Sequence, residues 1–530
     1  MKTICSLLLI LLLAACASTN PSEPERSGLT LVHINDTYRV GAVEDGTKGG
    51  FGRVVTVIRE LEAAGKDVRI LHGGDFLNPS LESQIWYGQQ MVEALNYLDA
   101  LAPMYVVAGN HEIDWRTPEH LIDAVRASSF DWLGDNYRFI TGDAAVDGAL
   151  QASFTFRHGD KTIGVFSLTA HADHGGNERA YMPIDQDYTG IAEQAIRRFE
   201  SAGVDAIIGL THLYMRQDLE LAALRARHPK FVLVAGGHDH EPEFSPMSDV
   251  SAAVIKGASN ARVIWIIDFE FDEDGQPHVT PKRMTMDANI AGDADYAGIE
   301  KHWRDRLLER FPFLEARIGT AALAMDAREE MIRTRESSWG NFIADRMRTA
   351  FGEPAADLAF INSGTLRIDD FIEGDILFED IGRTFGFSSF LRHVTVTGAE
   401  FRQIMQAGYR GEGGAQGYFP QVSGFRICVD RSRNDGDRIV SLEVPVENGW
   451  AEIEDDKEYS LVVPDFLYGG GDGYRVPGDR PASLPGSELK YLVLDGILAA
   501  TAEGMPVGVA VDASNRRFHE LREGKEACFR

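Results

Sequence analysis

Five strand-like apolar runs in the first half of the chain each end, within a few residues, in side chains that can bind a metal ion. The runs are 29–34, 68–71, 104–108, 206–210 and 231–235, and helical stretches are expected between them at 52–64, 84–98, 118–128, 189–202 and 218–227. Apolar strands that alternate with helices predict an α/β fold in which helices cover a sheet. Because the carboxyl ends of such strands lie along one edge, polar groups that follow different strands can meet in one site.

The side chains that follow these runs are carboxylates, a carboxamide and imidazoles. They are Asp36 after the first run, Asp75 after the second, Asn110 and His111 after the third, His212 after the fourth, and His238 and His240 after the fifth. One histidine after a strand is commonly a structural residue. Five strands in succession that each end in a possible metal ligand indicate a shared site. The set lacks thiolates, so it favours Zn²⁺, Mn²⁺, Fe or Co²⁺, and its size indicates two metal ions. Two cations clamp the oxygens of a phosphate ester and turn water into hydroxide, so the predicted chemistry is phosphoester hydrolysis, with Asp75 as the bridging ligand.

Four further histidines lie near the predicted site. We interpret His33 and His72, inside or just after strands, as structural or supporting groups. His171 and His174 lie in a glycine-rich stretch that could line the rim of a cleft, and the sequence leaves their role open.

The first residues carry the pattern of an export signal. The apolar run there is shorter than the roughly 20 residues that a membrane-spanning helix needs. Residues 13–16 resemble a bacterial lipobox, which predicts a signal peptide at 1–15 and lipidation of Cys16, with cleavage by an ordinary signal peptidase as the alternative. Ala17 is not the Asp that marks retention at the inner membrane. We therefore expect an exported protein, anchored in the outer membrane by its lipid and facing the periplasm, with 16–27 as a flexible tether.

The charge balance narrows the class of partner. With 52 Lys and Arg against 81 Asp and Glu, the formal net charge is −29, whereas nucleic acids are bound by clusters of Lys and Arg. We therefore expect no nucleic-acid partner. The length of 530 residues predicts two or three domains, and the oligomeric state stays open. Cys428 and Cys528 remain in the exported chain, either as a disulfide or as free thiols.

The second half of the chain begins with a charged helical stretch at 293–310 that can bridge two domains and serve as a hinge. Beyond it the apolar runs shorten, and Gly and Pro become frequent. Two stretches there, 418–424 and 466–474, place aromatic residues beside glycines. Two such rings could hold a flat base between them, or they could pack in the core. Arg335 and Arg367 suit anion binding through their forked donors, although most arginines in a charged protein are solvated or ion-paired.

The motifs resemble those of a known family. In chain order they are Asn35-Asp36, Gly73-Gly74-Asp75, Gly109-Asn110-His111-Glu112, Thr211-His212 and Gly237-His238-Asp239-His240. This set resembles the calcineurin-like metallophosphoesterases and, over essentially the whole mature chain, most closely the secreted 5′-nucleotidase and UDP-sugar hydrolase family. The resemblance implies an α/β sandwich of two sheets flanked by helices at 28–290, a linker helix at 291–318 and an α+β 5′-nucleotidase C-terminal domain at 319–530.

The resemblance also implies roles for the site residues. One metal ion would be held by Asp36, Asp75 and His240, and the other by Asp75, Asn110, His212 and His238. His111 would stabilise the transition state or protonate the leaving oxygen, oriented by Asp114. Phe419 and Tyr474 would stack on a base, while Arg335, Asn362 and Arg367 would contact ribose or phosphate. The expected activity is release of phosphate from nucleoside monophosphates by a hydroxide that two metal ions activate.

Two positions depart from the family pattern. Tyr38 stands where the family usually has His, and a neutral phenol is a poorer metal ligand than imidazole, so we expect the first metal site to be occupied but weaker. The acidic residue that the family often places near the ribose has no clear counterpart apart from Asp479. Two alternatives therefore stay open. One is a UDP-sugar or 2′,3′-cyclic-nucleotide hydrolase with the same site, and the other is a lipoprotein that binds nucleotide without cleaving it.

Overall fold

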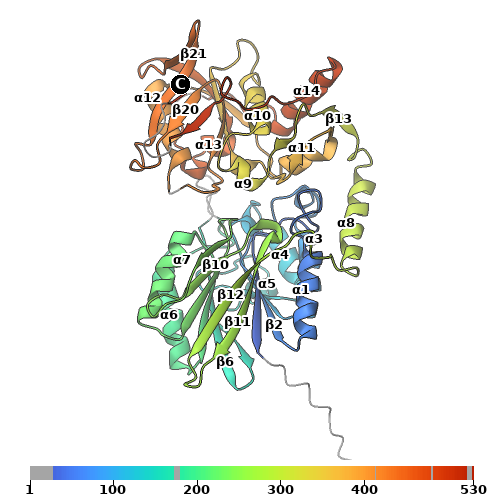
Figure 1. Ribbon diagram of the computed structural model, residues 1–530, viewed down its shortest axis with the longest axis vertical. Helices are drawn as coiled ribbons and strands as arrows, with labels where there is room; N and C mark the ends of the chain where they lie inside the picture. Colours follow the sequence, from blue (N-terminus) through green and yellow to red (C-terminus); the bar gives the residue numbers. More distant parts are fainter. Residues whose placement is uncertain (1–27, 172–178, 412, 479–481, 522–527, 530) are drawn as a thin grey trace, which may run out of the picture.

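The structure, a computed structural model, describes residues 28–171, 179–411, 413–478, 482–521 and 528–529. This part of the chain forms two bodies, with the N-terminal half below and the C-terminal half above in Figure 1, and helix α8 (Ala297–Arg310) runs along their side. The predicted signal peptide, the lipidation site Cys16 and the tether 16–27 lie outside the described residues. Within the described ranges, no helix combines the length and the apolar character needed to span a membrane.

The N-terminal half is a sandwich of two six-stranded sheets. The first sheet has the order β12 (Pro277–Thr285), β11 (Val263–Phe271), β1 (Leu29–Ile34), β2 (Asp67–His72), β3 (Met104–Val107) and β4 (Asp131–Leu133). The second has the order β5 (Phe154–His158), β6 (Lys161–Thr169), β7 (Ala206–His212), β8 (Phe231–Gly236), β10 (Ala253–Lys256) and β9 (Glu243–Ser245). Strands β1 to β4 are parallel, as are β6, β7, β8 and β10, so the carboxyl ends of each group share an edge.

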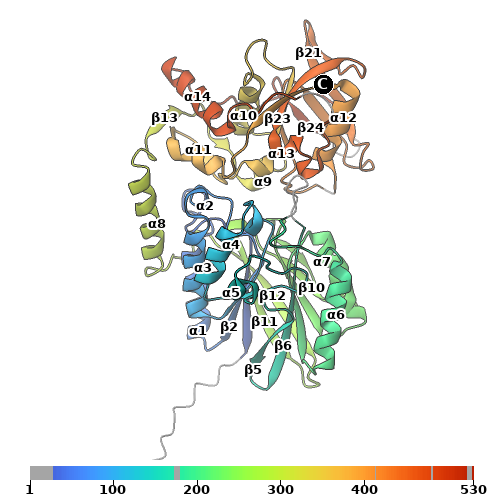
Figure 2. The same cartoon turned by 180° about the vertical axis from the view of Figure 1, so that it is seen from behind.

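Helices cover the outer face of each sheet, which confirms the predicted sandwich. The helices beside the first sheet are α1 (Phe51–Ala63), α3 (Gln89–Leu101) and α4 (Glu119–Ala127), and those beside the second are α6 (Tyr188–Ser201) and α7 (Met215–Ala222) (Figure 2). Because both faces of the central strands are covered, β1, β7 and β8 are buried along their whole length. One apolar cluster spans both sheets and holds the strand ends rigidly.

The expected helices form, with one clear exception. Those at 52–64, 118–128 and 189–202 match the structure to within one residue at each end. The stretch at 84–98 instead forms two helices, α2 (Ser83–Trp86) and α3, because Tyr87 and Gly88 have φ values of 55° and 83°. A right-handed helix cannot continue through two left-handed residues. The helix expected at 218–227 starts about one turn earlier, as α7, and ends in a 3₁₀ turn.

The C-terminal half is α+β, as expected. One four-stranded sheet has the order β18 (Leu391–Thr397), β23 (Glu458–Pro464), β15 (Leu358–Asn362) and β19 (Pro420–Ser423). A second four-stranded sheet has the order β22 (Gly449–Glu452), β21 (Ile439–Val446), β20 (Arg426–Val429) and β24 (Phe518–Glu520). Helices α10 (Ser338–Arg348) and α12 (Gly398–Gln406) pack against these sheets, and α14 (Leu489–Ala502) packs against α10. The short helix α9 (Glu329–Ile332) precedes α10 in the chain. Cys428 in β20 is bonded to Cys528 with an S–S distance of 2.07 Å, so the pairing that the sequence left open is a disulfide.

Candidate active site

Four of the candidate metal ligands lie on strained turns at strand ends. Asp36, Asp75, His238 and His240 have φ values of 51°, 58°, 82° and 64°, in the left-handed region that residues other than glycine rarely adopt. Each residue in that region costs about 1–3 kcal/mol and persists only where its surroundings determine it. Such strain concentrates at functional sites, so these turns are the first structural sign of one.

Glycines beside these ligands allow the turns of the two sheets to touch. Gly74 has φ of 84°, and a Cβ there would lie 2.8 Å from Nδ1 of His212. A Cβ on Gly237 would lie 2.2 Å from the carbonyl oxygen of Gly73. The glycine pairs after β2 and β8 therefore bring the edges of the two sheets into direct contact.

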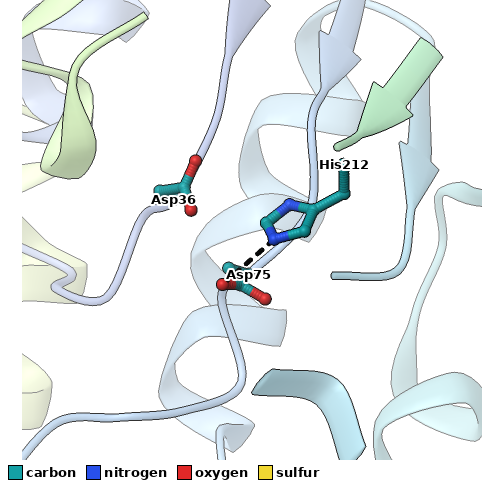
Figure 3. A group of neighbouring side chains, drawn as sticks. All are labelled: Asp36, Asp75 and His212. Carbon is teal, nitrogen blue, oxygen red and sulfur yellow. Dashed lines mark ion pairs between the residues drawn. The ribbon is translucent and has the colours of Figure 1, made fainter. Parts of the chain in front are cut away.

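Asp75 lies at the centre of the candidate metal centre. Figure 3 shows the ring of His212 directed at the Asp75 carboxylate, with Asp36 beside them. Oδ2 of Asp75 is 3.3 Å from Nε2 of His212. That nitrogen is also 3.1 Å from Oδ1 of Asn110 and 3.1 Å from Nδ1 of His238. Side chains from four strand ends thus meet at one point.

The spacing and burial of these groups fit a divalent cation. Asp36, Asp75 and His212 are at most 1% exposed, and ligands bonded to one ion at about 2.0–2.2 Å lie roughly 3.0–3.5 Å from one another. Burial raises the pKa of the Asp75 carboxyl, but His212 and His111 hold that pKa well below its usual range. Burial in turn lowers the pKa of His212, but Asp75 raises it to about 9. Asp75 and His212 therefore each stabilise the charged form of the other.

Tyr38 directs its phenol into the same cluster. Its hydroxyl is 2.9 Å from Nε2 of His240 and 3.3 Å from both Oδ1 of Asp36 and Oδ2 of Asp75. Nε2 of His240 is itself 3.3 Å from Oδ1 of Asp36. Burial, together with the charges of Asp75 and Asp36, raises the pKa of Tyr38 well above its usual value, so it stays a neutral phenol whose single proton can be donated to one of these groups.

His111 lies where the two halves of the molecule meet. Its Nδ1 donates a hydrogen bond of 2.8 Å to Oδ2 of Asp114, and a guanidinium nitrogen of Arg367 is 3.1 Å from its Nε2. Because a guanidinium group only donates, Nε2 is the unprotonated nitrogen in this arrangement. Asn78 also donates to Oδ2 of Asp114, at 2.5 Å, and the backbone N–H of His111 donates to Oδ1 of Asp75 at 2.8 Å. The ring is therefore fixed in both its position and its tautomer.

Glu112, the last residue of the Asn-His-Glu motif, supports the turns and does not contact the imidazole of His111. Its buried carboxylate accepts hydrogen bonds from the backbone N–H of Asp75 at 3.0 Å, of Phe76 at 2.8 Å and of Gly109. Burial, together with the charge of Asp75, raises the pKa of Glu112 to about 7. The carboxylate that forms a hydrogen bond with the imidazole of His111 is that of Asp114, as expected from the family resemblance.

Lys256 forms hydrogen bonds with the turn that carries His238 and His240. Its role was not predicted from the sequence. Lys256 is 0% exposed, and its Nζ donates to the carbonyl of Gly237 at 2.9 Å and to Oδ2 of Asp239 at 2.6 Å. It also pairs with Oδ2 of Asp218 at 3.0 Å. A lysine at the end of the otherwise apolar strand β10 was the signal that could have identified it, because a buried lysine needs ionic partners.

A cavity of about 370 Å³ joins the candidate metal centre to the C-terminal half. Its N-terminal wall includes Asp75, Asn110, His111, Tyr214, His238 and His240. Its C-terminal wall includes Arg333, Asn362, Arg367, Tyr418, Phe466 and Asp472. Cavities of roughly 300–1,000 Å³ with a few convergent polar groups are the usual sites for small organic ligands. Both halves therefore contribute to one site.

Comparison with known proteins identifies both halves of the chain. The family model of the calcineurin-like phosphoesterases matches residues 29–242, and that of the 5′-nucleotidase C-terminal domain matches residues 317–479. The chain belongs to the 5′-nucleotidase family of calcineurin-like phosphoesterases. It is accordingly a metal-dependent phosphoester hydrolase, and the cluster around Asp75 is a site that can hold a divalent metal ion.

Individual members of the family align with nearly the whole chain. The 5′-nucleotidase of Bos taurus is 24% identical over 520 residues, which cover 89% of this chain and 88% of the relative. The trifunctional nucleotide phosphoesterase protein YfkN of Bacillus subtilis (strain 168) is 24% identical over 499 residues, 86% of this chain and 33% of that protein. The crystal structure of a 5′-nucleotidase precursor from Thermus thermophilus has a TM-score of 0.80 at 23% identity and covers 93% of this chain and 99% of its own. The fold is shared across both halves.

The ring pair that the family resemblance implied does not reach the cavity in this structure. Phe419 is 1% exposed and Tyr474 is 0% exposed, and both rings pack in an apolar cluster of the C-terminal half. In this structure both rings are enclosed in the core and are not among the residues that line the cavity, and their stacking on a base stays a prediction. The hydroxyl of Tyr474 instead donates a hydrogen bond of 2.6 Å to the carbonyl of Tyr418, and the aromatic rings of the C-terminal half that line the cavity include Tyr418 and Phe466.

Two of the three polar residues expected beside ribose or phosphate line the cavity, namely Asn362 and Arg367. Arg335 does not line it. Its side chain is exposed, and its carbonyl accepts a hydrogen bond of 2.9 Å from Nε2 of Gln421. Arg333 lines the cavity in its place and is 4% exposed. Residues two apart at the end of a helical turn point in different directions, which is why the neighbouring arginine takes the expected position.

Of the four further histidines near the predicted site, two are buried, one lines the cavity and one lies outside the described residues. His33 and His72 are buried. His33 forms a hydrogen bond of 2.9 Å with a backbone carbonyl, and His72 forms one of 2.8 Å with a threonine hydroxyl. Burial lowers their pKa values to about 4 and about 3, so both rings are neutral supports. His171 lines the cavity. His174, like Asp479 in the C-terminal half, lies outside the described residues.

Proposed function

We propose that the protein is a 5′-nucleotidase that releases phosphate from nucleoside monophosphates. The observation that carries this proposal is the cavity of about 370 Å³, which has the candidate metal ligands on one wall and the Tyr418 and Phe466 rings on the other. A nucleoside monophosphate has an anionic group at one end and a flat base at the other, and these two walls match the two ends.

Two divalent metal ions are proposed for the phosphate end. Asp36, Asp75 and His240 hold one ion, with Tyr38 beside it, and Asp75, Asn110, His212 and His238 hold the other. The distances of 3.1–3.3 Å within these groups support the assignment. When bound, the ions neutralise the phosphoryl oxygens and activate water. Their identity among Zn, Mn, Fe and Co stays open.

The chain itself supplies the proton and the anion contacts. His111, held by Asp114, presents Nε2 to the cavity, so its imidazolium form can protonate the departing ester oxygen. Arg367, whose guanidinium lies 3.1 Å from that nitrogen, can donate two parallel hydrogen bonds to a phosphate. Nδ2 of Asn362 donates to Oδ2 of Asp472 at 2.7 Å, and both residues line the cavity, which supports a role for them as partners of the sugar hydroxyls.

The base end is proposed at Tyr418 and Phe466. The guanidinium of Arg410 lies 3.7 Å from the centre of the Tyr418 ring and supports that ring from one face. Phe466 packs against Gly471, where a Cβ would lie 2.5 Å from the ring. Both rings are therefore held in place before a ligand arrives, and stacking contributes about 1–3 kcal/mol per base with little dependence on its identity.

We further propose that the chain is exported and lipid-anchored at Cys16, with the nucleotide pocket completed by a C-terminal domain at 319–530 after a linker at 291–318. The sequence around residues 13–16 supports the anchor. Mass spectrometry of the protein purified from membranes tests it. A diacylglyceryl modification on an N-terminal Cys16 is expected, and an unmodified N-terminus at another residue contradicts the anchor.

Substrate choice separates the proposal from its alternatives. UDP-sugars and 2′,3′-cyclic nucleotides stay open as alternative substrates, because one fold can carry out several phosphoesterase reactions. The test measures phosphate release by the metal-loaded mature protein from AMP, UDP-glucose and 2′,3′-cyclic AMP, with Asp75→Asn as the inactive control. The highest kcat/KM on AMP is expected. A preference for either other substrate moves the activity to that class, and tight AMP binding without release by any metal form identifies a binding lipoprotein.

A further inference from the structure

A carboxylate from the C-terminal half touches one of the proposed metal ligands. Glu329, the first residue of α9, is 2% exposed. Its Oε2 lies 2.9 Å from Nδ1 of His240, which belongs to the turn after β8 in the N-terminal half. The same oxygen accepts a hydrogen bond of 2.6 Å from the hydroxyl of Ser259. The contact therefore crosses between the two halves of the molecule at the metal centre itself.

Cations and backbone hold Glu329 in this place. A guanidinium nitrogen of Arg333 is 2.8 Å from Oε1, and one of Arg262 is 3.5 Å from Oε2. The backbone N–H of Glu329 donates to Oδ1 of Asp369 at 2.9 Å, and that oxygen also pairs with Arg262 at 3.1 Å. A buried carboxylate is stable only when it is compensated in this way. Its position is consequently well determined.

The carboxylate decides which nitrogen of His240 faces the metal centre. A carboxylate only accepts hydrogen bonds, so Nδ1 of His240 carries a proton, which leaves Nε2 as the ring nitrogen that can bind a metal ion. Nε2 is the nitrogen that lies 3.3 Å from Oδ1 of Asp36 and 2.9 Å from the hydroxyl of Tyr38. Carboxylates that hold a ligating histidine in this way raise its basicity and orient its ring.

We propose that Glu329 is a positioning residue for the metal centre, supplied by the C-terminal half, which holds His240 in its metal-binding tautomer and orientation. The inference rests on the proposed role of His240 as a metal ligand. It means that the affinity of the site for its metal depends on the packing of the two halves, although no proposed ligand comes from the C-terminal half. The neighbouring Glu330 is exposed and pairs with Arg328 at 2.8 Å, so it offers a matched control on the same helix.

The experiment measures metal binding rather than turnover. The full mature chain and its variants Glu329→Gln, Glu329→Asp and Glu330→Gln are stripped with chelator, checked for an unchanged melting temperature without metal, and titrated with Mn²⁺ in a calorimeter. Loss of the carboxylate in Glu329→Gln is expected to weaken one Mn²⁺ site by about 10- to 100-fold. Glu329→Asp keeps the buried charge beside Arg262 and Arg333 but withdraws it from His240, so it is expected to weaken the same site and to remain folded. Glu330→Gln is expected to bind as the parent does.

A second pair of variants tests whether the effect passes through His240. In a His240→Asn background, replacing Glu329 by Gln is expected to cause no further loss of Mn²⁺ affinity, because the ring that it orients is absent. Parent-like Mn²⁺ binding by both Glu329 variants overturns the inference and leaves the proposed function intact. A parent protein that binds no Mn²⁺, Zn²⁺ or Co²⁺ overturns the proposed function instead. An equal loss in the His240→Asn background shows a general charge effect and also overturns the inference.

Discussion

The metal-binding half of the site and its substrate-binding half are built in different ways. Asp36, Asp75 and His212 come from turns at the ends of buried strands and are at most 1% exposed. Tyr418 and Phe466 come from segments beside short elements, the first just before β19 and the second in α13 (Asp465–Tyr468). A strand end in a covered sheet fixes where a side chain lies, whereas a connecting segment leaves two or more directions open.

The largest expected effect tests the metal-binding half. His111→Ala is expected to lower kcat on AMP by about 100- to 10,000-fold, because the proposed proton donor to the leaving oxygen is lost. His120→Ala is the matched control, since that ring stacks on Tyr87 at 4.2 Å. Steady-state kinetics with the melting temperature of each variant check the result. Equal activity of His111→Ala and the parent contradicts the role given to His111.

The sharpest test of the substrate-binding half uses two adjacent residues. Phe419→Ala is expected to lower the free energy of unfolding by about 3–5 kcal/mol, because Phe419 is a core residue. Tyr418→Ala is expected to lower stability by less, because Tyr418 is only partly buried, and to weaken nucleotide binding by about 1–3 kcal/mol. Urea unfolding and the KM for AMP measure the two effects. The reverse pattern, with binding lost in Phe419→Ala and stability lost in Tyr418→Ala, restores the ring pair implied by the family resemblance.

A third prediction concerns the C-terminal half alone, namely how its free energy of unfolding depends on pH. Burial raises the pKa of Glu336, which accepts hydrogen bonds from the backbone N–H of Arg517 at 2.7 Å and of Phe518 at 3.0 Å, to about 7. The folded C-terminal half therefore binds this proton more tightly than the unfolded chain does, and stability falls as the pH rises from about 4.5 to about 7.

Glu336→Gln cannot ionise, so it is expected to remove about 3 kcal/mol of that pH dependence. Urea unfolding of the parent and the variant at pH 5 and pH 8 measures the difference. Parallel pH profiles for the two proteins contradict the assignment to Glu336.

The smallest expected effect concerns Tyr38. Tyr38→His is expected to tighten the weaker metal site by about tenfold, or about 1.4 kcal/mol, because imidazole is a better ligand than a neutral phenol. Metal content after dialysis against metal-free buffer measures it. If the parent keeps two full equivalents as well as the variant does, the first site is not weakened by the phenol.

The pattern of apolar runs was sufficient to predict a sheet covered by helices and the grouping of the candidate metal ligands, whereas the division into two sheets was implied only by the family resemblance. Periodic apolar runs specify buried strands, and the polar residues after them converge because parallel strands share an edge. The burial of Phe419 beside a cavity-lining Tyr418 could not be predicted, since adjacent residues of an extended segment point to opposite sides and only packing decides which side is core. The role of Glu329 could not be predicted from the sequence either. Its contact with His240 joins residues 89 apart in the chain, and no motif connects them.

The most direct test of the account is a metal titration of the stripped protein. Phosphate release from AMP is followed while Mn²⁺ is added, and bound metal per chain is counted at each step. The account predicts no phosphate release without metal, and full release only as a second equivalent of Mn²⁺ binds. Asp75→Asn is expected to recover neither the phosphate release nor the binding of two equivalents. Full release from a chelator-treated protein that holds no metal, or full release at one equivalent, contradicts the two-metal site around Asp75.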